Sequence, residues 1–451
     1  MSAKRLDVRS RAIDILLRVE KAGAWASVLL EHAEAQIDDR RDRALLHELV
    51  LGVLRRRATL DHLIQSVSSR PIERVDPMVM AAIRIGAYTM TCLDRIPTHA
   101  AVSTSVEAIR ERRPRATGFA NAILRAISKL DDESAWPAEP QGGDLKGLAM
   151  WTSHPLWWVE RLVDRLGWVG ARNLLVANNR PAATHLRPNT IGFAGQSLEE
   201  FGAELLERGC LTRPGRVVPD ALRVVDGSPA GVLSEGRGWV QDEASQLVTL
   251  LAYAGPGMSV LDCCAAPGGK TMHLASTVGV SGRVVAVDRH AGRMRRLHRN
   301  LERTAMPHVV TLIADMTGET AIGGQFDRVL VDAPCSGSGT LRRHPEIRWR
   351  LEPETIKLLA ERQVKLLGRA ADRLLERGRL IYSVCSIEPE EGEQVIEAFL
   401  AGRPEFHAVD PRSALPAEAQ SLVGEDHFLR TRPDRLGLDG FFACALERRV
   451  G

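Results

Sequence analysis

The sequence lacks the long hydrophobic runs that a membrane-spanning helix requires. Its longest stretch without a charged residue, 244–261, contains Ser245, Gln246 and the turn-forming sequence Gly255-Pro256-Gly257. A spanning helix needs about 20 mainly apolar residues. The first nine residues carry four charged side chains and no apolar segment follows them, which argues against a signal peptide. We therefore expect a cytoplasmic protein without a membrane-spanning segment.

The cysteines form no spaced framework. There are seven of them, an odd number, and no Cys-x-x-Cys pair occurs. Disulfide-rich domains and zinc sites depend on regular spacings of that kind. The sequence therefore predicts free thiols in a reducing compartment and no metal site. Because free cysteine is often a core residue, four of the seven are interpreted as buried packing: Cys92, Cys210, Cys263 and Cys444.

The chain of 451 residues is too long for one ordinary core, so two or three domains are expected. Hydrophobic residues at 44% and charged residues at 26% are typical of a globular protein. Residues 1–130 carry 22 Lys and Arg against 15 Asp and Glu, a net charge of +7 (22 − 15) in a chain whose total is +3. This basic front part indicates nucleic-acid binding. A solvated, Arg-rich helical face explains the same composition equally well.

Apolar residues recur at helical spacing throughout residues 1–130, for example at Ala12, Ile15, Leu16 and Val19. This periodicity predicts an all-α domain. Residues 131–149 mix proline, glycine and acidic residues without periodicity, which predicts a linker. Residues 150–241 combine a Trp-rich helical pattern with short strand-like pieces, near 184–188, 217–225 and 237–241, and predict a small α+β domain.

Residues 242–451 predict a doubly wound, Rossmann-like α/β domain, because apolar runs alternate with helix-length segments from residue 258 onward. The predicted strands are 258–264, 283–287, 309–313, 327–331 and 379–384. A helix at about 353–377 joins the last two strands, and residues 429–448 predict a closing hairpin.

Two cysteines follow the last two predicted parallel strands, in Val329-Leu-Val-Asp-Ala-Pro-Cys335 and Leu380-Ile-Tyr-Ser-Val-Cys385. Neighbouring strands lie about 5 Å apart, and ligands in such sheets collect beyond the carboxyl ends of the strands. The sequence therefore predicts a nucleophile site that contains Cys335, Cys385 and the carboxylate of Asp332.

A small-residue loop follows the first strand, in Ala265-Ala-Pro-Gly-Gly-Lys-Thr271. A phosphate-binding Walker A loop would need glycine where Cys264 stands, and the spacing of a dinucleotide fingerprint also fails. An S-adenosylmethionine pocket needs only a tight turn here, an acid after the second strand for the ribose, and a polar group after the third strand near the adenine. The predicted cofactor-binding residues are Cys264, Ala265, Ala266, Pro267, Gly268, Gly269, Lys270, Asp288, Asp315 and Asp332.

Three motifs together resemble the RNA cytosine-C5 methyltransferases: Leu261-Asp-Cys-Cys-Ala-Ala-Pro-Gly-Gly-Lys-Thr271, Asp332-Ala-Pro-Cys-Ser-Gly-Ser-Gly-Thr340 and Tyr382-Ser-Val-Cys-Ser386. The front part, with Arg84-Ile-Gly-Ala-Tyr88 and Gly118-Phe-Ala-Asn-Ala-Ile-Leu-Arg125, resembles the NusB-like helical domain. Both resemblances together indicate the RsmB/Sun/Fmu branch, whose members methylate small-subunit ribosomal RNA. Val384 departs from the threonine that is frequent in this family.

The resemblance implies that Cys385 adds to carbon 6 of the target cytosine, that Asp332 contacts the base edge, and that Cys335 acts in product release. Lys270 is expected to orient Asp332 or the base. S-adenosylmethionine is the implied cofactor, and small-subunit (16S) ribosomal RNA is the implied partner. The product that the resemblance implies is 5-methylcytosine.

Arginines in two regions are candidate RNA contacts. One set lies in the helical front part and the other directly follows the predicted catalytic loop. They are Arg55, Arg56, Arg57, Arg110, Arg112, Arg113 and Arg115, and then Arg342, Arg343 and Arg348. An alternative to the enzyme is an RNA-binding assembly or antitermination-type factor with a non-catalytic body. A P-loop nucleotidase is a second alternative, which the missing first glycine disfavours.

Overall fold

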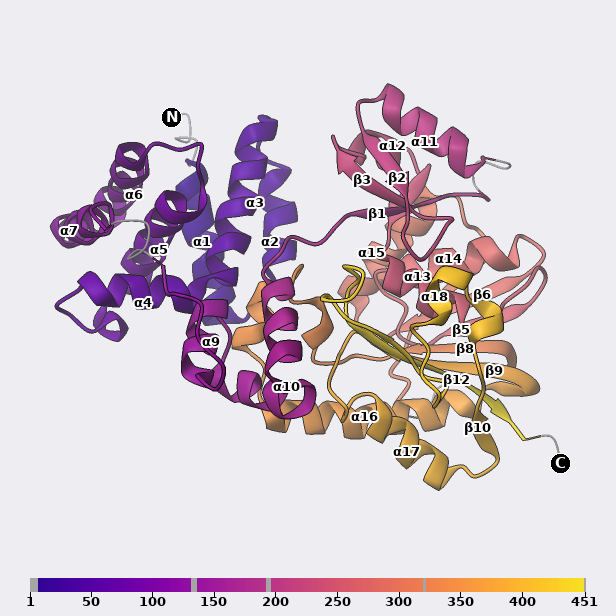
Figure 1. Ribbon diagram of the computed structural model, residues 1–451. Coiled ribbons are helices and arrows are strands. Elements are labelled where there is room, and N and C mark those ends of the chain that lie inside the picture. The colour runs from indigo at the N-terminus through magenta and orange to yellow at the C-terminus, as the bar shows by residue number, and fades with distance from the viewer. Residues whose placement is uncertain (1–6, 131–135, 192–195, 319–321, 450–451) are drawn as a thin grey trace. The chain divides into compact units, whose positions relative to one another are not determined.

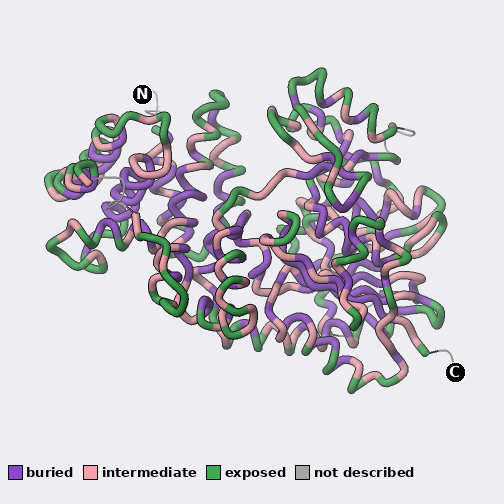
Figure 2. Tube along the Cα trace, in the orientation of Figure 1, coloured by how far each residue is buried: buried purple, intermediate pink, exposed green. Residues whose placement is uncertain are grey.

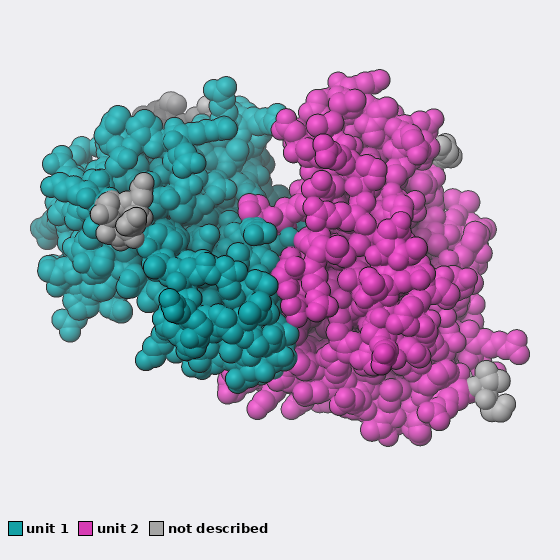
Figure 3. Space-filling model, in the orientation of Figure 1, with its two compact units in different colours: residues 1–180, 341–350 teal, residues 181–340, 351–451 magenta. Residues whose placement is uncertain are grey.

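The computed structural model describes residues 7–130, 136–191, 196–318 and 322–449 (Figure 1). The chain divides into two compact units, which Figure 3 distinguishes by colour. Unit 1 contains residues 1–180 and 341–350, and unit 2 contains residues 181–340 and 351–451. Within the described ranges, no helix combines the length and apolarity needed to cross a membrane.

Unit 1 is helical, which confirms the all-α prediction for the front part. Its main helices are α1 (Val8–Ala22), α2 (Ala26–Glu34), α3 (Arg40–Arg55), α4 (Arg57–Val67), α5 (Pro77–Cys92), α6 (Thr98–Arg112), α7 (Thr117–Ile127), α9 (Leu145–Thr152) and α10 (Leu156–Asn178). Helix α5 is the most deeply buried, and its apolar side chains pack against α1, α3, α6 and α7. Helix α9 begins inside the segment predicted as a linker, and residues 131–135 of that segment lie outside the described residues.

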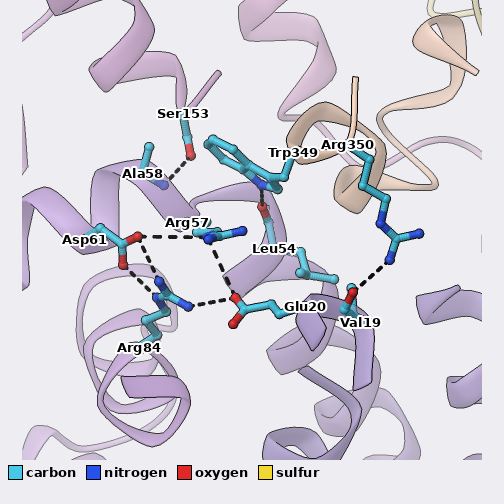
Figure 4. Close-up of polar contacts among 10 residues, drawn as sticks. All are labelled: Val19, Glu20, Leu54, Arg57, Ala58, Asp61, Arg84, Ser153, Trp349 and Arg350. Carbon is cyan, nitrogen blue, oxygen red and sulfur yellow. Dashed lines mark hydrogen bonds and ion pairs between the residues drawn. The ribbon is translucent and has the colours of Figure 1, made fainter. Parts of the chain in front are cut away.

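One buried charge on α5 is neutralised within unit 1. Arg84 donates hydrogen bonds to Asp61 and to Glu20 (Figure 4). Arg57 lies near the same two carboxylates, at 3.7 Å from Glu20 and 4.0 Å from Asp61. A buried guanidinium is tolerated only with such compensation, so this cluster of two arginines and two acids fixes how α1, α4 and α5 pack.

The short segment 341–350 belongs to unit 1, although its neighbours in sequence belong to unit 2. It contains the 3₁₀ helix η4 (Pro345–Trp349). Trp349 Nε1 donates to the carbonyl of Leu54 at 3.0 Å, and Arg350 donates to the carbonyl of Val19 at 3.0 Å (Figure 4). The segment therefore attaches to the helical unit through backbone acceptors at the ends of α1 and α3.

Arg348 is fully buried within this segment. Its Nη1 donates to the carbonyls of Arg55 and Ser153, both at 3.0 Å, and to Asn179 Oδ1 at 2.9 Å. These acceptors lie at the C-terminal ends of α3, α9 and α10, where helix dipoles place partial negative charge. The prediction that Arg342, Arg348 and Arg55 contact RNA is wrong, because these residues are only 5%, 0% and 6% exposed.

Unit 2 contains two sheets. The smaller has the strand order β2-β3-β1-β4, with β1 (His185–Pro188), β2 (Leu211–Pro214), β3 (Leu222–Asp226) and β4 (Gly238–Val240), and helices α11 (Leu198–Glu207) and α12 (Ala230–Ser234). Strand β2 was not predicted, because its sequence Leu-Thr-Arg-Pro is mostly exposed and lacks apolar alternation.

The larger sheet has the order β10-β12-β9-β8-β5-β6-β7, and β11 also pairs with β12. Its strands are β5 (Ser259–Asp262), β6 (Arg283–Asp288), β7 (Val309–Ile313), β8 (Phe326–Asp332), β9 (Leu374–Val384), β10 (Phe406–Ala408), β11 (Leu429–Thr431) and β12 (Phe441–Arg448). Strands β9, β8, β5, β6 and β7 are parallel, which confirms the predicted Rossmann-like sheet. Strands β11 and β12 form the predicted closing hairpin.

Helices cover both faces of this sheet. Helices α13 (Glu243–Leu250), α14 (Gly269–Val278) and α15 (Ala291–Arg303) share one hydrophobic core with it, and α16 (Pro353–Ala371) and α17 (Glu393–Gly402) share another. A short helix, α18 (Ala417–Gln420), lies in the C-terminal part. Buried residues concentrate on the central strands (Figure 2). The helix predicted at 353–377 ends at Ala371, since Leu374 already pairs with β8.

Candidate active site

The two cysteines of the predicted nucleophile site lie close together at one edge of the larger sheet. Strands β8 and β9 are parallel neighbours, and Asp332 is in register with Ser383. Cys335 follows the first strand and Cys385 follows the second, so both loops leave the sheet at its carboxyl edge. The two sulfur atoms are 3.3 Å apart.

The two thiols are not equivalent. The hydrogen bond with Cys385, together with burial, raises the pKa of the Cys335 thiol well above its ordinary value. Since the thiolate is the nucleophilic form of cysteine, this environment disfavours Cys335 as an attacking sulfur.

Asp332 ends β8 with both carboxylate oxygens engaged. Its Oδ2 accepts a hydrogen bond from Lys270 Nζ at 2.7 Å, and its Oδ1 accepts one from Ser383 Oγ at 2.8 Å. The Lys270 ammonium also lies 5.0 Å from the centre of the Phe441 ring. The structure thus joins Lys270 to Asp332, as the sequence predicted, while the role of Ser383 was missed because nothing local distinguishes it from other serines.

The small-residue loop 264–270 connects β5 to α14. Gly268 has a φ of +111°, and a Cβ atom there would lie 2.4 Å from Leu297 Cδ1. Only glycine fits this position, since the left-handed backbone and the lack of space both exclude a side chain. The loop leads directly into α14, which begins at Gly269. Free N–H groups at a helix start favour anionic or polar ligand groups.

Asp262 lies beneath this loop and was not predicted as a site residue. Its Oδ2 accepts a hydrogen bond from Thr271 Oγ1 at 2.7 Å, and the residue is only 1% exposed. Burial raises the pKa of Asp262 to about 7. The feature of the sequence that could have identified Asp262 is its position at the end of β5, the strand that lies between β8 and β6.

Asp288 and Asp315 follow the next two strands outward. Asp288 is buried at the end of β6, and its Oδ1 accepts the backbone N–H of His290 at 2.8 Å. Asp315 is more exposed, and its Oδ2 accepts a hydrogen bond from Arg362 at 3.0 Å. Hydrogen bonds from the N–H and hydroxyl of Thr317 lower the pKa of Asp315. The three predicted acids, Asp332, Asp288 and Asp315, thus lie at or just beyond the carboxyl ends of β8, β6 and β7.

Three family models match consecutive parts of the chain. The model described as 16S rRNA methyltransferase RsmB/F matches residues 249–447. The NusB family model matches residues 6–129, and the RsmF/B-like ferredoxin-like domain matches residues 154–230. The last range includes most of the smaller sheet of unit 2.

Relatives match over nearly the whole length. The probable ribosomal RNA small subunit methyltransferase B of Bacillus subtilis (strain 168) is 32% identical, covering 99% of this chain and 100% of the relative. The ribosomal RNA small subunit methyltransferase B of Vibrio cholerae serotype O1 is 34% identical, covering 98% of each chain.

Two solved structures share this architecture. The crystal structure of PH0851 superposes with a TM-score of 0.82 at 27% identity, covering 99% of this chain and 100% of that one. A methyltransferase homolog protein from Pyrococcus horikoshii has a TM-score of 0.58 at 23% identity, covering 68% of this chain and 100% of that one. The second likeness concerns the fold alone.

Proposed function

Because this chain belongs to the 16S rRNA methyltransferase RsmB/F family, we propose that it methylates carbon 5 of a cytosine in small-subunit ribosomal RNA, with S-adenosylmethionine as the methyl donor. The observation that carries the choice of carbon 5 is the 3.3 Å separation of the Cys335 and Cys385 sulfur atoms. Methyl transfer to an oxygen or an amine needs no such pair of thiols.

Carbon 5 of cytosine is too weak a nucleophile to take a methyl group unaided. The Cys385 thiolate forms a bond from sulfur to carbon 6, and the electron pair displaced from the ring double bond makes carbon 5 enamine-like. S-Adenosylmethionine, when bound, supplies an activated methyl group on a sulfonium. Carbon 5 then carries both a methyl group and a proton. A base takes this proton, the electron pair of the C–H bond re-forms the ring double bond, and the sulfur–carbon bond breaks with its electron pair returning to Cys385.

Cys335 acts in the release step in this proposal. Its sulfur lies beside that of Cys385, and its raised pKa means that it holds a proton, which it gives to the Cys385 sulfur as the sulfur–carbon bond breaks. A group placed within hydrogen-bond distance of the reacting atoms can move a proton in the transition state. The division of labour is therefore between an attacking sulfur, Cys385, and a sulfur that serves proton transfer, Cys335.

Asp332 orients the base and stabilises charge in this proposal. Lys270 and Ser383 fix its carboxylate from two sides, so its position costs no reorganisation during the reaction. Contact with the N3/N4 edge of cytosine would select this base, because a cytosine protonated at N3 can share its proton with a carboxylate. Negative charge that develops on the ring during addition would be offset by the same proton.

The residues around α14 fit S-adenosylmethionine. The loop 264–269 offers a glycine turn and a helix start for the amino acid moiety, and Asp288 offers a buried carboxylate for the ribose hydroxyls. S-adenosylmethionine carries no phosphate, so it does not require the lysine that a Walker A loop uses to bind one. Lys270 is instead paired with Asp332. Asp315 is proposed near the adenine, where its exposed carboxylate could exchange Arg362 for the ligand.

Unit 1 is proposed to hold the RNA through exposed arginines near the end of α6. Arg110 and Arg113 are more than half exposed, and Arg115 is exposed as well. We expect replacement of all three by glutamine to weaken RNA binding and to reduce the slope of log K against log salt by about 2–3. Arg40 and Arg41, exposed beside Asp39 and Asp42, provide the control pair, whose replacement should leave the slope unchanged.

Bisulfite mapping of 16S ribosomal RNA from cells with and without the gene tests the proposed reaction. One cytosine should lose its protection when the gene is deleted and regain it when the intact gene is restored. Restoration with the Cys385→Ala variant should fail. An unchanged bisulfite pattern would contradict cytosine-C5 methylation. Restored growth or assembly with the inactive variant would instead favour a non-catalytic assembly factor.

A further inference from the structure

A cluster of serine hydroxyls lies next to the two thiols in sequence and links their loops in space. Ser336 follows Cys335, and Ser386 follows Cys385. The Ser336 and Ser386 hydroxyl oxygens are 3.2 Å apart, and those of Ser338 and Ser386 are 3.1 Å apart. Ser338 and Ser386 are 1% and 0% exposed. The two cysteine-bearing loops are therefore joined by a buried polar contact and not only by the strands that precede them.

Glu391 completes this cluster with a charge. The residue is 0% exposed and precedes α17. Its Oε2 accepts a hydrogen bond from Ser336 Oγ at 2.5 Å, and its Oε1 accepts one from the backbone N–H of Ser336 at 2.8 Å. Both carboxylate oxygens thus bind the residue directly after Cys335.

Gln363 on α16 holds the other side of the same loop. Its Nε2 donates to the carbonyl of Pro334 at 2.9 Å and to Glu391 Oε1 at 3.1 Å. Cys335 is therefore flanked by two residues, Pro334 and Ser336, that are both anchored through Glu391 or its partner Gln363. Its position is determined from both sides.

The loop after Cys385 is tied to the same cluster. Ser386 Oγ accepts the backbone N–H of Glu388 at 3.1 Å, and Ser338 Oγ accepts the N–H of Ile387 at 3.0 Å. The N–H of Gly339 donates directly to the carbonyl of Cys385 at 3.1 Å. Displacement of Ser336 would therefore be transmitted through shared hydrogen bonds to the backbone at Cys385.

Joining two loops through a buried carboxylate carries a free-energy penalty. Removing a charge from water carries a large penalty unless hydrogen bonds compensate it. Burial indeed raises the pKa of Glu391, and the hydrogen bonds from the serines and Gln363 oppose this effect. Here those bonds converge on the residues that adjoin the reactive thiols, where a small displacement has a large effect on rate.

We propose that Glu391 is a positioning residue for methyl transfer, which holds the Cys335 and Cys385 loops so that both sulfurs meet the same base. The proposal deepens the proposed reaction, because it concerns the geometry of the same two thiols. Glu391 acts through Ser336 and Gln363 and has no contact with the reacting atoms in this scheme. Its loss should separate the sulfurs while leaving the cofactor loop intact.

The first test measures how close the thiols are held, without RNA or cofactor. Oxidised glutathione converts the two thiols to one disulfide and is itself reduced to two molecules of glutathione. The equilibrium constant, read by mass spectrometry of alkylated peptides, gives the effective concentration of Cys335 and Cys385 for one another. We expect Glu391→Gln to lower this effective concentration at least about tenfold. The carboxylate accepts hydrogen bonds with both oxygens, whereas the glutamine side chain would place an NH2 group against one of those donors.

The control is Glu243→Gln. Glu243 is also buried, at 1% exposed, and accepts hydrogen bonds from the N–H groups of Val217 and Val218, away from both cysteine loops. This variant should keep the wild-type equilibrium. Ser336→Ala provides a second test if Glu391→Gln does not fold, because it removes one hydroxyl and leaves the charge partly bonded; a reduction of about threefold is expected. A wild-type value in every foldable variant, or no disulfide in the wild type, would overturn the proposal.

The second test separates positioning from general stability through kinetics. Glu391→Gln should lower kcat for RNA methylation by more than about tenfold while the KM for S-adenosylmethionine stays within about twofold, because the cofactor loop is untouched. A purely structural role would lower the amount of active protein without this split. If the glutathione equilibrium shifts but neither the wild-type protein nor any variant methylates RNA, Glu391 still positions the two thiols, and the proposed reaction fails.

Discussion

Lys270 on α14 donates a hydrogen bond to Asp332 at the end of β8, with 2.7 Å between Nζ and Oδ2. The pair is largely shielded from solvent, because the two side chains are 10% and 30% exposed. It connects the small-residue loop 264–270 to the loops that carry Cys335 and Cys385, across adjacent strands β5 and β8. Ion pairs with this degree of burial are costly to break, since the remaining charge is left without compensation.

We predict that Lys270→Met lowers methyl transfer by about 10–100-fold, because Asp332 loses one of the two partners that fix its carboxylate. The affinity for S-adenosylmethionine should change less than kcat, and calorimetry would measure it. The control is Lys357→Met at an exposed position of α16, which should keep full activity. An unchanged kcat in Lys270→Met would contradict the role given to this pair.

Replacement of the two thiols should have opposite consequences for a covalent complex. Cys385→Ala should abolish methyl transfer while S-adenosylmethionine still binds, because the attacking sulfur is gone. Cys335→Ala should accumulate a protein–RNA adduct, since addition proceeds and release stalls. Denaturing gels with labelled RNA would reveal the shifted band. Cys92→Ala in unit 1 is the control and should show neither defect; an adduct in Cys385→Ala would rule out the assigned nucleophile.

Asp262 should make stability depend on pH. Its pKa is raised from an ordinary value of 3.8 to about 7, so the folded state holds this proton more tightly than the unfolded state does. Its contribution to the free energy of unfolding is therefore greatest below about pH 4 and is lost as the pH rises towards 7. The loss is on the order of 2–4 kcal/mol.

Urea unfolding of wild type and Asp262→Asn between pH 4.5 and 7.5 would measure this effect. The difference in unfolding free energy between the two proteins should become less favourable to the wild type as the pH rises. The exposed Asp226→Asn variant should show a constant difference over the same range. A constant difference for Asp262→Asn as well would mean that this carboxylate has no raised pKa.

Arg348→Leu should destabilise unit 1 by about 2–4 kcal/mol, because the carbonyls of Arg55 and Ser153 would lose a buried donor. Arg348→Lys should recover only part of this loss, since an ammonium cannot reproduce the planar geometry of a guanidinium. Helical circular dichroism during urea unfolding would measure both. Arg110→Ala, at an exposed position of α6, should stay within about 0.5 kcal/mol of the wild type. Equal stability of all variants would contradict the anchoring role of Arg348.

The sequence alone predicted the features that depend on local pattern. Buried parallel strands are continuous apolar runs, so the parallel sheet was predictable. The location of Cys335 and Cys385 beyond the carboxyl ends of their strands was predictable for the same reason. Helical periodicity likewise predicted the helices of the front part. Strand β2 was missed because its four residues lack such a pattern.

Only the tertiary structure decided which distant groups complete the site and which charges are buried. The arginines of segment 341–350 have the composition of an RNA-binding surface, yet Arg348 is buried, because α3, α9 and α10 end around it. Glu391 looks like an ordinary surface acid in the sequence, but it is fully buried in the fold. Hydrophobic periodicity predicts the local secondary structure around each residue. The hydrogen-bond partners of a side chain and its exclusion from solvent depend on distant segments that folding brings together.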